Sequence, residues 1–170
     1  TIHKYGKVII NDISAGELDP LIVDVAAEHD VPYVAMHMKG DPRTMQSMTD
    51  YRDIVAEVVD YFRERTAQLR ERGVRRIVVD PGFGFAKTLE QNYELLRGLH
   101  SLAELGYPVL AGVSRKSMIY KLLGTTPAEA LNGTTALHWE CLRQGAVILR
   151  AHDTREAVEV VRMFDQFMQA

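Results

Sequence analysis

Five polar residues stand at the ends of apolar runs of the chain or within three residues after them: Asn11, Asp80, Lys116, Arg150 and His152. They supply an amide, a carboxylate, an ammonium, a guanidinium and an imidazole. This set of donors and acceptors suits a planar heterocycle that also carries an anionic group. Arg150 and His152 are two positions apart, so in an extended segment they point to the same side and can clamp a phosphate.

Each of these residues also has a structural interpretation. Asn11 and Asp80 are common turn formers at strand ends, and Lys116 can be a solvated lysine. Arg150 is harder to explain in this way, because arginine is rarely buried without a partner. His37 fits a packed histidine at the rim of the sheet better than a ligand.

The elements that would position these residues alternate between short apolar runs and longer helical patterns. Strands are predicted at residues 8–10, 33–37, 77–80, 109–113 and 146–149, and helices at 20–28, 50–72, 88–105, 134–143 and from 153 or 154 onward. The apolar runs are continuous, as in parallel strands that are covered on both faces. Because the carboxyl ends of parallel strands meet on one face, we expect the polar residues to converge there.

These five β/α units predict a single α/β domain over residues 1–170. Two architectures fit the alternation, an open doubly wound sheet and a (β/α)8 barrel. A complete barrel usually needs roughly 250 residues, and at least about 200. A barrel built from this chain would therefore lack about three units.

The composition excludes several classes of protein. The chain has 170 residues, 46% of them hydrophobic, and 20 basic residues face 23 acidic ones for a net charge of -3, which disfavours disorder and nucleic-acid binding. No apolar run approaches the roughly 20 residues of a membrane span, and no secretion leader is visible. The lone Cys141 suits a reducing compartment, so we expect a cytoplasmic protein.

Two nucleotide-binding motifs are rejected. Gly82 and Gly84 begin a dinucleotide fingerprint, but its third glycine would fall at Lys87, where close helix packing forbids a long side chain. The segment 86–88 is similar to a P-loop but lacks the glycine before the lysine. No spacing of Cys and His is typical of a zinc site.

Five segments carry a resemblance to a known family: Ile10-Asn11-Asp12-Ile13, Met36-His37-Met38, Asp80-Pro81-Gly82-Phe83-Gly84-Phe85, Ser114-Arg115-Lys116-Ser117 and Arg150-Ala151-His152. Over essentially its whole length the chain resembles the dihydropteroate synthases, folate-pathway enzymes that sulfonamides target. The resemblance implies a TIM (β/α)8 barrel, truncated to about its last five β/α units. It also implies a pterin-binding transferase that joins 6-hydroxymethyl-7,8-dihydropterin pyrophosphate to p-aminobenzoate, giving 7,8-dihydropteroate and pyrophosphate.

The resemblance also assigns the residues. It makes Lys116, Arg150 and His152 catalytic, and it makes Asn11, Asp80, Phe85, Lys116, Ser117, Arg150 and His152 substrate-binding. Asn11, Asp80 and Lys116 would bind the pterin, and Arg150 and His152 would hold the pyrophosphate. Phe85 and Ser117 would border p-aminobenzoate.

Three elements of the family are absent from this sequence: a Thr-Pro-Asp-Ser-Phe type loop, an Arg-Pro-Gly type loop and a strand-end aspartate. The first helps to hold Mg²⁺, so we expect the complete enzyme to use Mg²⁺ with no metal ligand in this chain. We predict that these 170 residues alone are inactive as a synthase. The family also suggests a homodimer.

Two alternatives stay open. One is a non-catalytic pterin-binding module. The other is a pterin-dependent corrinoid methyltransferase domain, which shares the barrel and the pterin residues. Lys116, Arg150 and His152 argue against the methyltransferase, because a methyl donor has no pyrophosphate to bind.

Overall fold

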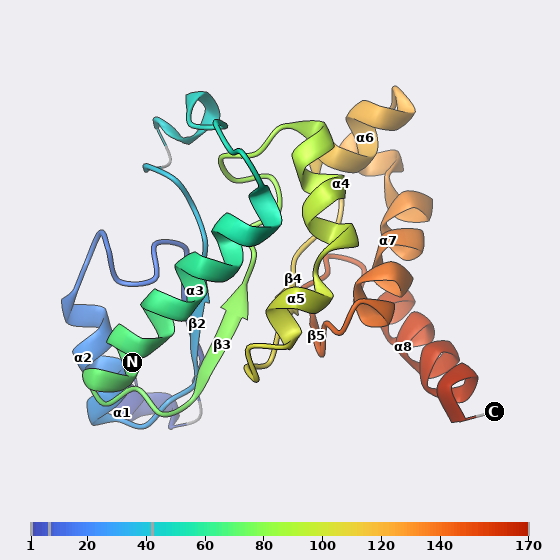
Figure 1. The fold of residues 1–170 in the computed structure, drawn as a ribbon. Helices are drawn as coiled ribbons and strands as arrows, with labels where there is room; N and C mark the ends of the chain where they lie inside the picture. The colour runs from blue at the N-terminus through green and yellow to red at the C-terminus, as the bar shows by residue number, and fades with distance from the viewer. Residues whose placement is uncertain (1, 7, 42, 170) are drawn as a thin grey trace.

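A computed structural model describes residues 2–6, 8–41 and 43–169 of the chain, which alternate strands with helices (Figure 1). The strands are β1 Ile10–Asp12, β2 Tyr33–Met36, β3 Ile77–Asp80, β4 Leu110–Ala111 and β5 Ile148–Leu149. The helices are α1 Ile2–Tyr5, α2 Leu21–Glu28, α3 Ile54–Glu71, α4 Leu89–Arg97, α5 His100–Ala103, α6 Ser117–Leu123, α7 Leu131–Arg143 and α8 Thr154–Gln169, with 3-10 turns η1 Met45–Ser47 and η2 Pro127–Glu129.

The described strands are parallel neighbours in chain order. β1 pairs with β2 and β2 with β3, in a register that places Asn11 beside Val34. β4 pairs with β5, and a parallel bridge between Val79 and Val109 connects the two groups. A doubly wound sheet reverses its strand order at a switch point, whereas the strands of a (β/α)8 barrel stay in chain order. The order of these strands is therefore the one found in a barrel.

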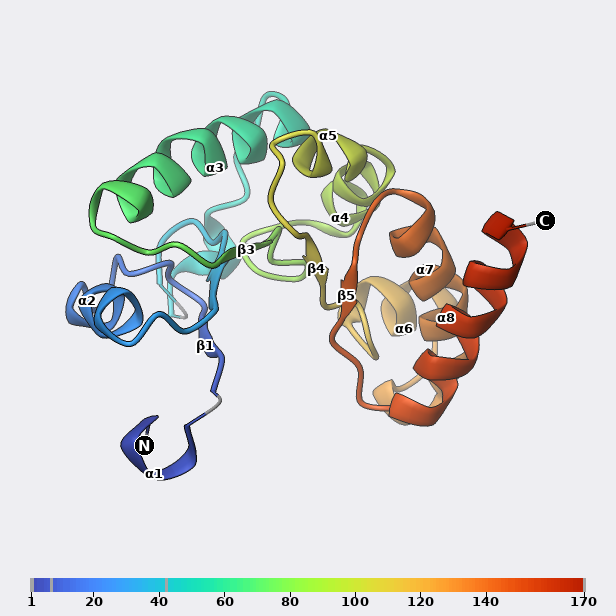
Figure 2. The same ribbon diagram turned by 90° about the horizontal axis from the view of Figure 1, so that it is seen from below.

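The helices cover one face of the strands. Seen from below, α2, α3, α4, α7 and α8 form an arc outside them (Figure 2). The main core lies between the two layers and buries Tyr33 and Phe62 completely. Alternate strand residues point the other way, where Val34, Val78 and Leu110 form a separate small cluster. We call this second side the inner face.

The expectation that both faces are covered holds only for the central strands. Val34, Val78 and Leu110 are buried, but Ile148, which pairs with Leu110 on the neighbouring strand, is 37% exposed. Ile9, next to the first strand, is 66% exposed. The inner face is thus open toward its two edges.

Local sequence signals explain where the longer helices begin. The carboxylate of Asp53 accepts a hydrogen bond from the Ala56 N–H at 3.0 Å and caps α3. Thr88 and Gln91 form a capping box at the start of α4. The buried side of α3 includes Ile54, Val58, Phe62 and Leu69, at helical spacing.

Several predicted boundaries are wrong: the strands at 33–36, 110–111 and 148–149 are shorter than predicted, and two helices begin at 54 and 131 in place of 50 and 134. Two further differences affect the site and the packing. The first strand lies at Ile10–Asp12 and not at residues 8–10, so Asn11 is inside the strand. The helix predicted at 88–105 is divided into α4 and α5 at Gly98. A Cβ on Gly98 would come within 2.6 Å of a methyl group of Val55, so the break lets this segment approach α3 closely.

Within the described part of the chain, none of the helices combines the length and the apolar composition that a membrane crossing requires.

Candidate functional site

Asp80 is the buried centre of the polar residues at the strand ends. It ends β3, and its side chain is 1% exposed. Its Oδ1 accepts a hydrogen bond from the Gly82 N–H at 2.8 Å, whereas its Oδ2 has no hydrogen-bond partner among the described residues. Burial raises the pKa of the carboxyl, opposed by the Gly82 N–H and by the charges of Arg150, Lys116 and Lys87. A buried oxygen of this kind is suited to accept hydrogen bonds from a ligand.

Lys116 lies beside the loop that follows Asp80. Its Nζ donates a hydrogen bond to the carbonyl of Phe83 and lies 4.3 Å from the centroid of the Phe85 ring. A Cβ on Gly84 would come within 3.2 Å of Lys116 Cδ, so this glycine makes room for the lysine stem. Burial lowers the pKa of Lys116 to about 8, although Asp80 opposes the shift. The ammonium is therefore charged at neutral pH.

Arg150 follows β5 and extends across β4 toward Asp80. Its Nη2 lies 3.7 Å from Asp80 Oδ2, and its side chain is 40% exposed. The guanidinium lies over Gly112, where a Cβ would come within 2.6 Å of Nη2. Sequence reasoning missed Gly112, because a glycine in a strand has several explanations. At this distance Arg150 keeps N–H donors available for an anion.

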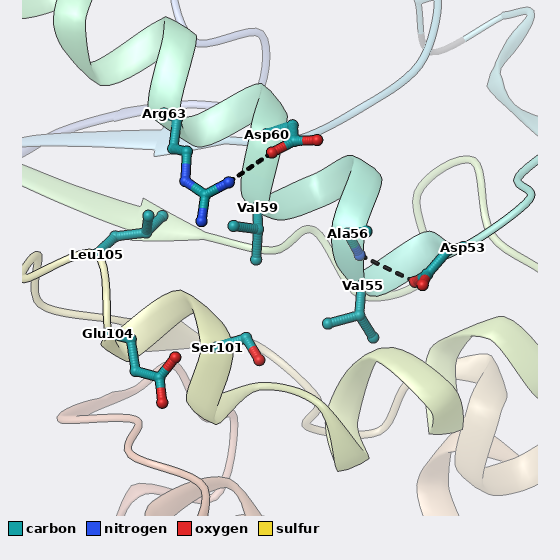
Figure 3. Close-up of a pocket in the computed structure, with 9 residues that line it drawn as sticks. All are labelled: Asp53, Val55, Ala56, Val59, Asp60, Arg63, Ser101, Glu104 and Leu105. Carbon is teal, nitrogen blue, oxygen red and sulfur yellow. Dashed lines mark hydrogen bonds and ion pairs between the residues drawn. The ribbon is translucent and has the colours of Figure 1, made fainter.

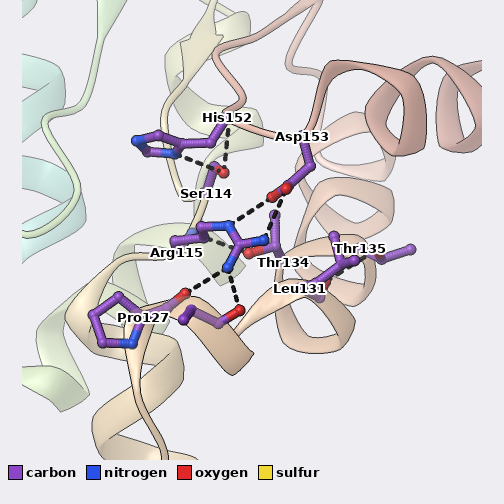
Figure 4. Close-up of polar contacts among 9 residues, drawn as sticks. Ser114, Arg115, Pro127, Leu131, Thr134, Thr135, His152 and Asp153 are labelled. Atoms are coloured by element: carbon purple, nitrogen blue, oxygen red, sulfur yellow. Dashed lines mark hydrogen bonds and ion pairs between the residues drawn. The ribbon is translucent and has the colours of Figure 1, made fainter.

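His152 is held by Ser114, which lies at the end of the neighbouring β4 segment (Figure 4). The backbone N–H of His152 donates to Ser114 Oγ at 3.1 Å, and His152 Nδ1 lies 3.0 Å from the same oxygen. The serine hydroxyl proton can be donated to Nδ1, which leaves Nε2 as the protonated, donating nitrogen. Because the His152 residue is exposed, Nε2 is accessible to a ligand.

Arg115 connects the loop after β4 to the loop after β5 (Figure 4). Its Nε and Nη2 bind Asp153 Oδ2 and Oδ1, each at 2.8 Å, and its Nη1 donates to the carbonyls of Pro127 and Ala128. Its own N–H donates to Thr134 Oγ1 at 2.9 Å. Sequence reasoning missed this arrangement, although Arg115 lies within the Ser-Arg-Lys-Ser segment.

The structure brings together some of the sequence-predicted residues and separates others. Asp80, Lys116, Phe85 and Arg150 form one connected group. Asn11 is exposed on β1, two strands away from Asp80 on the same inner face. Among the described residues, His152 binds Ser114 and forms no hydrogen bond or ion pair with the side chains of this group. Of the five polar residues expected to converge, the structure therefore brings Asp80, Lys116 and Arg150 together.

Ser117 begins α6 and lines a separate crevice of about 240 Å³ between α4 and α6. Lys87 and Asn92 line the same crevice, which lies beside the loop that carries Phe85. Ser117 is thus close to the connected group in the chain but faces different neighbours.

The described residues do not fit a metal site. They contain no group of three or more His, Cys, Asp and Glu side chains that could hold a metal ion. The carboxylate of Asp80 already accepts a hydrogen bond and lies near three cationic side chains. We therefore derive no chemical step from a metal held by these residues.

A larger groove lies on the outer side, between α3 and α5 (Figure 3). Its volume is about 450 Å³, and its lining is Asp53, Val55, Ala56, Val59, Asp60, Arg63, Ser101, Glu104 and Leu105. Three of its charged side chains are engaged locally: Arg63 pairs with Asp60 at 2.7 Å, and Asp53 caps its helix. No sequence-predicted site residue lines it, so the strand ends remain the candidate site.

Parallel strands in barrel order, with a buried carboxylate and basic residues at their carboxyl ends, define an α/β protein with a site for a polar, anionic ligand. The family model described as pterin binding enzyme matches residues 2–152. The chain belongs to this family.

Relatives agree with this assignment. The chain is 42% identical to the dihydropteroate synthases of Synechocystis and of Escherichia coli K12, which it matches over 94% and 98% of its own length. Dihydropteroate synthase from Thermus thermophilus, solved in complex with 6HMPPP, is 40% identical, with a TM-score of 0.91 over 96% of this chain and 66% of that one. The same enzyme is also solved in complex with 4-aminobenzoate. The chain spans 56% and 60% of the two curated relatives.

Proposed function

We propose that the chain is the substrate-binding portion of a dihydropteroate synthase, a transferase of folate biosynthesis. The observation that carries the proposal is the buried Asp80, whose Oδ2 lies without a hydrogen-bond partner among the described residues at the carboxyl end of β3. The amino group and ring N–H of a pterin present two donors side by side, and a carboxylate binds such an edge well. The synthases among the relatives support the choice of reaction.

The pterin would lie on the inner face, over the ends of β1 to β4. Lys116 can donate to the pterin carbonyl or to a ring nitrogen, in place of its bond to the Phe83 carbonyl. Asn11 offers both a donor and an acceptor from β1. Because Asn11 and Asp80 are two strands apart on one face, a flat ring can span them.

The pyrophosphate would bind Arg150 and His152. In the reaction, the bond between the pterin methylene carbon and the pyrophosphate oxygen breaks, and the p-aminobenzoate nitrogen forms a bond to that carbon. The amine then loses a proton, and the electron pair of the broken bond leaves with pyrophosphate. Arg150 N–H groups and His152 Nε2 stabilise the charge that develops on the departing oxygens.

The p-aminobenzoate would lie against Phe85, with Ser117 near its other end. The Phe85 ring already contacts the Lys116 ammonium, so this side of the site is partly apolar and partly cationic. This combination suits an aromatic acid, and sulfonamides would compete there.

The complete enzyme would be a TIM (β/α)8 barrel in which further β/α units extend the five strands described. Those units would bring the Mg²⁺ ligands and the loops that cover the substrates. We therefore expect the 170 residues alone to bind pterin without turning over. A non-catalytic pterin-binding module would also bind pterin without turnover, but it would stay inactive within its natural full-length chain.

We also propose a cytoplasmic homodimer. Met163, Phe167 and Met168 on α8 are 66%, 67% and 65% exposed, and Trp139 of α7 packs edge-on against Phe167. A second copy can cover this apolar strip. Sedimentation of the wild type and of Met163→Glu tests it, because a monomeric wild type contradicts the proposal.

The function is tested by two measurements on one preparation. Pterin binding is followed by the fluorescence of 6-hydroxymethylpterin, and turnover by p-aminobenzoate-dependent release of pyrophosphate. We expect the 170 residues to bind pterin, and we expect turnover only in the natural full-length chain. Failure of Asp80→Asn to weaken pterin binding would contradict the proposed site, and turnover independent of p-aminobenzoate would contradict the reaction.

A further inference from the structure

Lys87 is a buried lysine for which the proposed reaction has no role. The residue is 8% exposed, and its Nζ lies 3.1 Å from the carbonyl oxygen of Gly82 and 2.9 Å from that of Phe85. The third neighbour is His37 Nδ1, at 3.0 Å. Two backbone carbonyls and an imidazole thus accept hydrogen bonds from this ammonium, and none of the three is a carboxylate.

His37 is built to accept the hydrogen bond from Lys87. The residue is 3% exposed, and burial, Lys87 and Lys39 lower its pKa well below the usual range. The imidazole is therefore neutral, so Nδ1 can act as an acceptor for the ammonium. Its ring packs edge-on against Tyr61, with the centroids 4.9 Å apart, which fixes the position of this acceptor. The interpretation of His37 as a packed rim histidine agrees with these contacts.

The loop that Lys87 holds has an unusual backbone conformation. Gly82, Gly84 and Ala86 all have positive φ, of 68°, 80° and 50°. Alanine rarely adopts this conformation, so the surrounding contacts must maintain it. A Cβ on Gly82 would come within 2.1 Å of the His37 carbonyl oxygen, which shows how closely the loop lies against β2.

Two lysines bind three carbonyls of this loop. Lys87 binds those of Gly82 and Phe85, and Lys116 binds that of Phe83, which lies between them. The Gly82 N–H in turn donates to Asp80 Oδ1. Any movement of the loop would therefore displace the carboxylate, the Phe85 ring and the Lys116 ammonium together.

We propose that Lys87 is a positioning residue of the pterin site, which holds loop 81–86 so that Asp80, Phe85 and Lys116 keep their relative places. The inference rests on the proposed function. Lys87 also contributes positive charge near Asp80, and this charge opposes the rise in the pKa of that carboxyl. The charged and titratable groups that face Lys87 are His37, Asp80, Lys116 and Lys39.

The test compares Lys87→Met and Lys87→Gln with Lys39→Met in the natural full-length chain. Lys39 is a matched control, because its ammonium also acts on His37 but binds Glu57 and the Asp50 carbonyl instead of the loop. Binding of 6-hydroxymethylpterin is measured as a function of pH, and folding is followed by circular dichroism.

We expect Lys87→Met to weaken pterin binding by about tenfold, as when a group that orients a ligand-binding side chain is removed. We also expect the acid limit of binding to move to higher pH, because loss of the Lys87 charge raises the pKa of Asp80 further. Lys87→Gln keeps a donor but no charge, so its affinity loss should be smaller and its pH shift the same. Lys39→Met should show neither effect.

Four results would overturn the proposal or separate it from the proposed function. Equal affinities and pH profiles in Lys87→Met and Lys39→Met would contradict it, as would lower stability with unchanged binding. Failure of both Lys87 variants to fold would show a role in the whole fold, not a local one. If the wild type binds no pterin, the proposed function fails. The positioning role of Lys87 is then tested by amide hydrogen exchange at Gly84 and Phe85. Faster exchange in Lys87→Met supports the proposal that Lys87 holds loop 81–86, and unchanged exchange rejects it.

Discussion

Arg115 and Asp153 form a two-point ion pair that joins the loops following β4 and β5, with both nitrogen–oxygen distances at 2.8 Å. Each partner is the chain neighbour of a candidate site residue: Lys116 follows Arg115, and His152 precedes Asp153. The pair is therefore placed to fix the spacing between the lysine proposed for the pterin and the histidine proposed for the pyrophosphate.

The first prediction concerns Arg115→Lys. Lysine keeps the charge but cannot bind Asp153 at two points while also reaching the η2 carbonyls. We expect the affinity for pyrophosphate, measured by calorimetry, to fall by about tenfold, because His152 loses its fixed place. Arg155→Lys is the control, since Arg155 forms an exposed pair with Glu159 on α8, and it should have no effect. Wild-type affinity in Arg115→Lys would show that the pair does not position the anion site.

The second prediction concerns the effect of the Asp80 charge on the free energy of unfolding. Burial raises this pKa above the ordinary value of 3.8. Above the raised pKa the folded protein carries a buried charge that the unfolded chain carries in water, and this charge lowers the free energy of unfolding. As the pH falls through the raised pKa, the folded protein takes up a proton and the cost is relieved.

Asp80→Asn should consequently raise the midpoint of thermal unfolding at neutral pH while weakening pterin binding. Asparagine keeps an oxygen for the Gly82 N–H but loses the charge that pairs with the ligand. We expect a loss of affinity of roughly 100-fold, equivalent to about 3 kcal/mol for hydrogen bonds to a charged group. Asp165→Asn, on the exposed side of α8, should change neither quantity. A destabilised Asp80→Asn protein would mean that Asp80 serves the fold.

The positions of the site residues could be predicted because strand ends are marked in the sequence. The apolar run at Ile77–Asp80 predicts β3 to the residue, and parallel pairing brings its end beside those of its neighbours. The prediction that Asn11 follows its strand is wrong, because Val8 and Ile9 are as apolar as Ile10 although they precede the strand. Periodicity alone does not fix where pairing begins.

Other parts of the site depend on contacts between residues far apart in the chain. Lys87 and His37 are 50 positions apart, and Arg115 and Asp153 are 38 apart. A lysine is normally exposed, so nothing local predicts that Lys87 is buried against carbonyls that exist only in the folded loop. The need for glycine at position 112 becomes clear only in the fold, where the Arg150 guanidinium lies over it.

The third prediction concerns the alkaline side of pterin binding. The pKa of Lys116 is about 8, and only the charged form is a full donor to the ligand. We expect pterin affinity to decline as the pH rises through about 8, and Lys116→Met to remove this limb. Burial lowers the pKa of Lys87 to about 7, so in the wild type its titration lies below this limb. An unchanged limb near pH 8 in Lys116→Met would contradict the assignment.

The same pKa shift affects stability with a definite sign. The folded pKa of Lys116 lies below the ordinary value of 10.5, so between the two values the unfolded chain binds more protons than the folded protein. The free energy of unfolding should therefore gain a positive slope with pH in this window. Lys116→Met should reduce that slope, as denaturant titrations at several pH values would show.

The last prediction separates the anion site from the pterin site through Ser114→Ala. The substitution removes the hydroxyl that accepts from the His152 N–H and binds Nδ1. The imidazole ring then loses the contact that orients it and selects Nε2 as the donor, so we expect pyrophosphate to bind several-fold more weakly. The contacts of Asp80 and Lys116 do not involve Ser114, so pterin affinity should stay the same.

Loss of a buried hydrogen bond should also lower the free energy of unfolding by roughly 1 kcal/mol. Ser101→Ala, on the outer groove, is the control for removing a serine hydroxyl far from the strand ends. Stability alone cannot distinguish an orienting serine from a structural one, but the ratio of the two ligand affinities can. Equal losses for pterin and pyrophosphate would mean that Ser114 supports the strand ends as a whole, whereas a loss confined to pyrophosphate would assign it to His152.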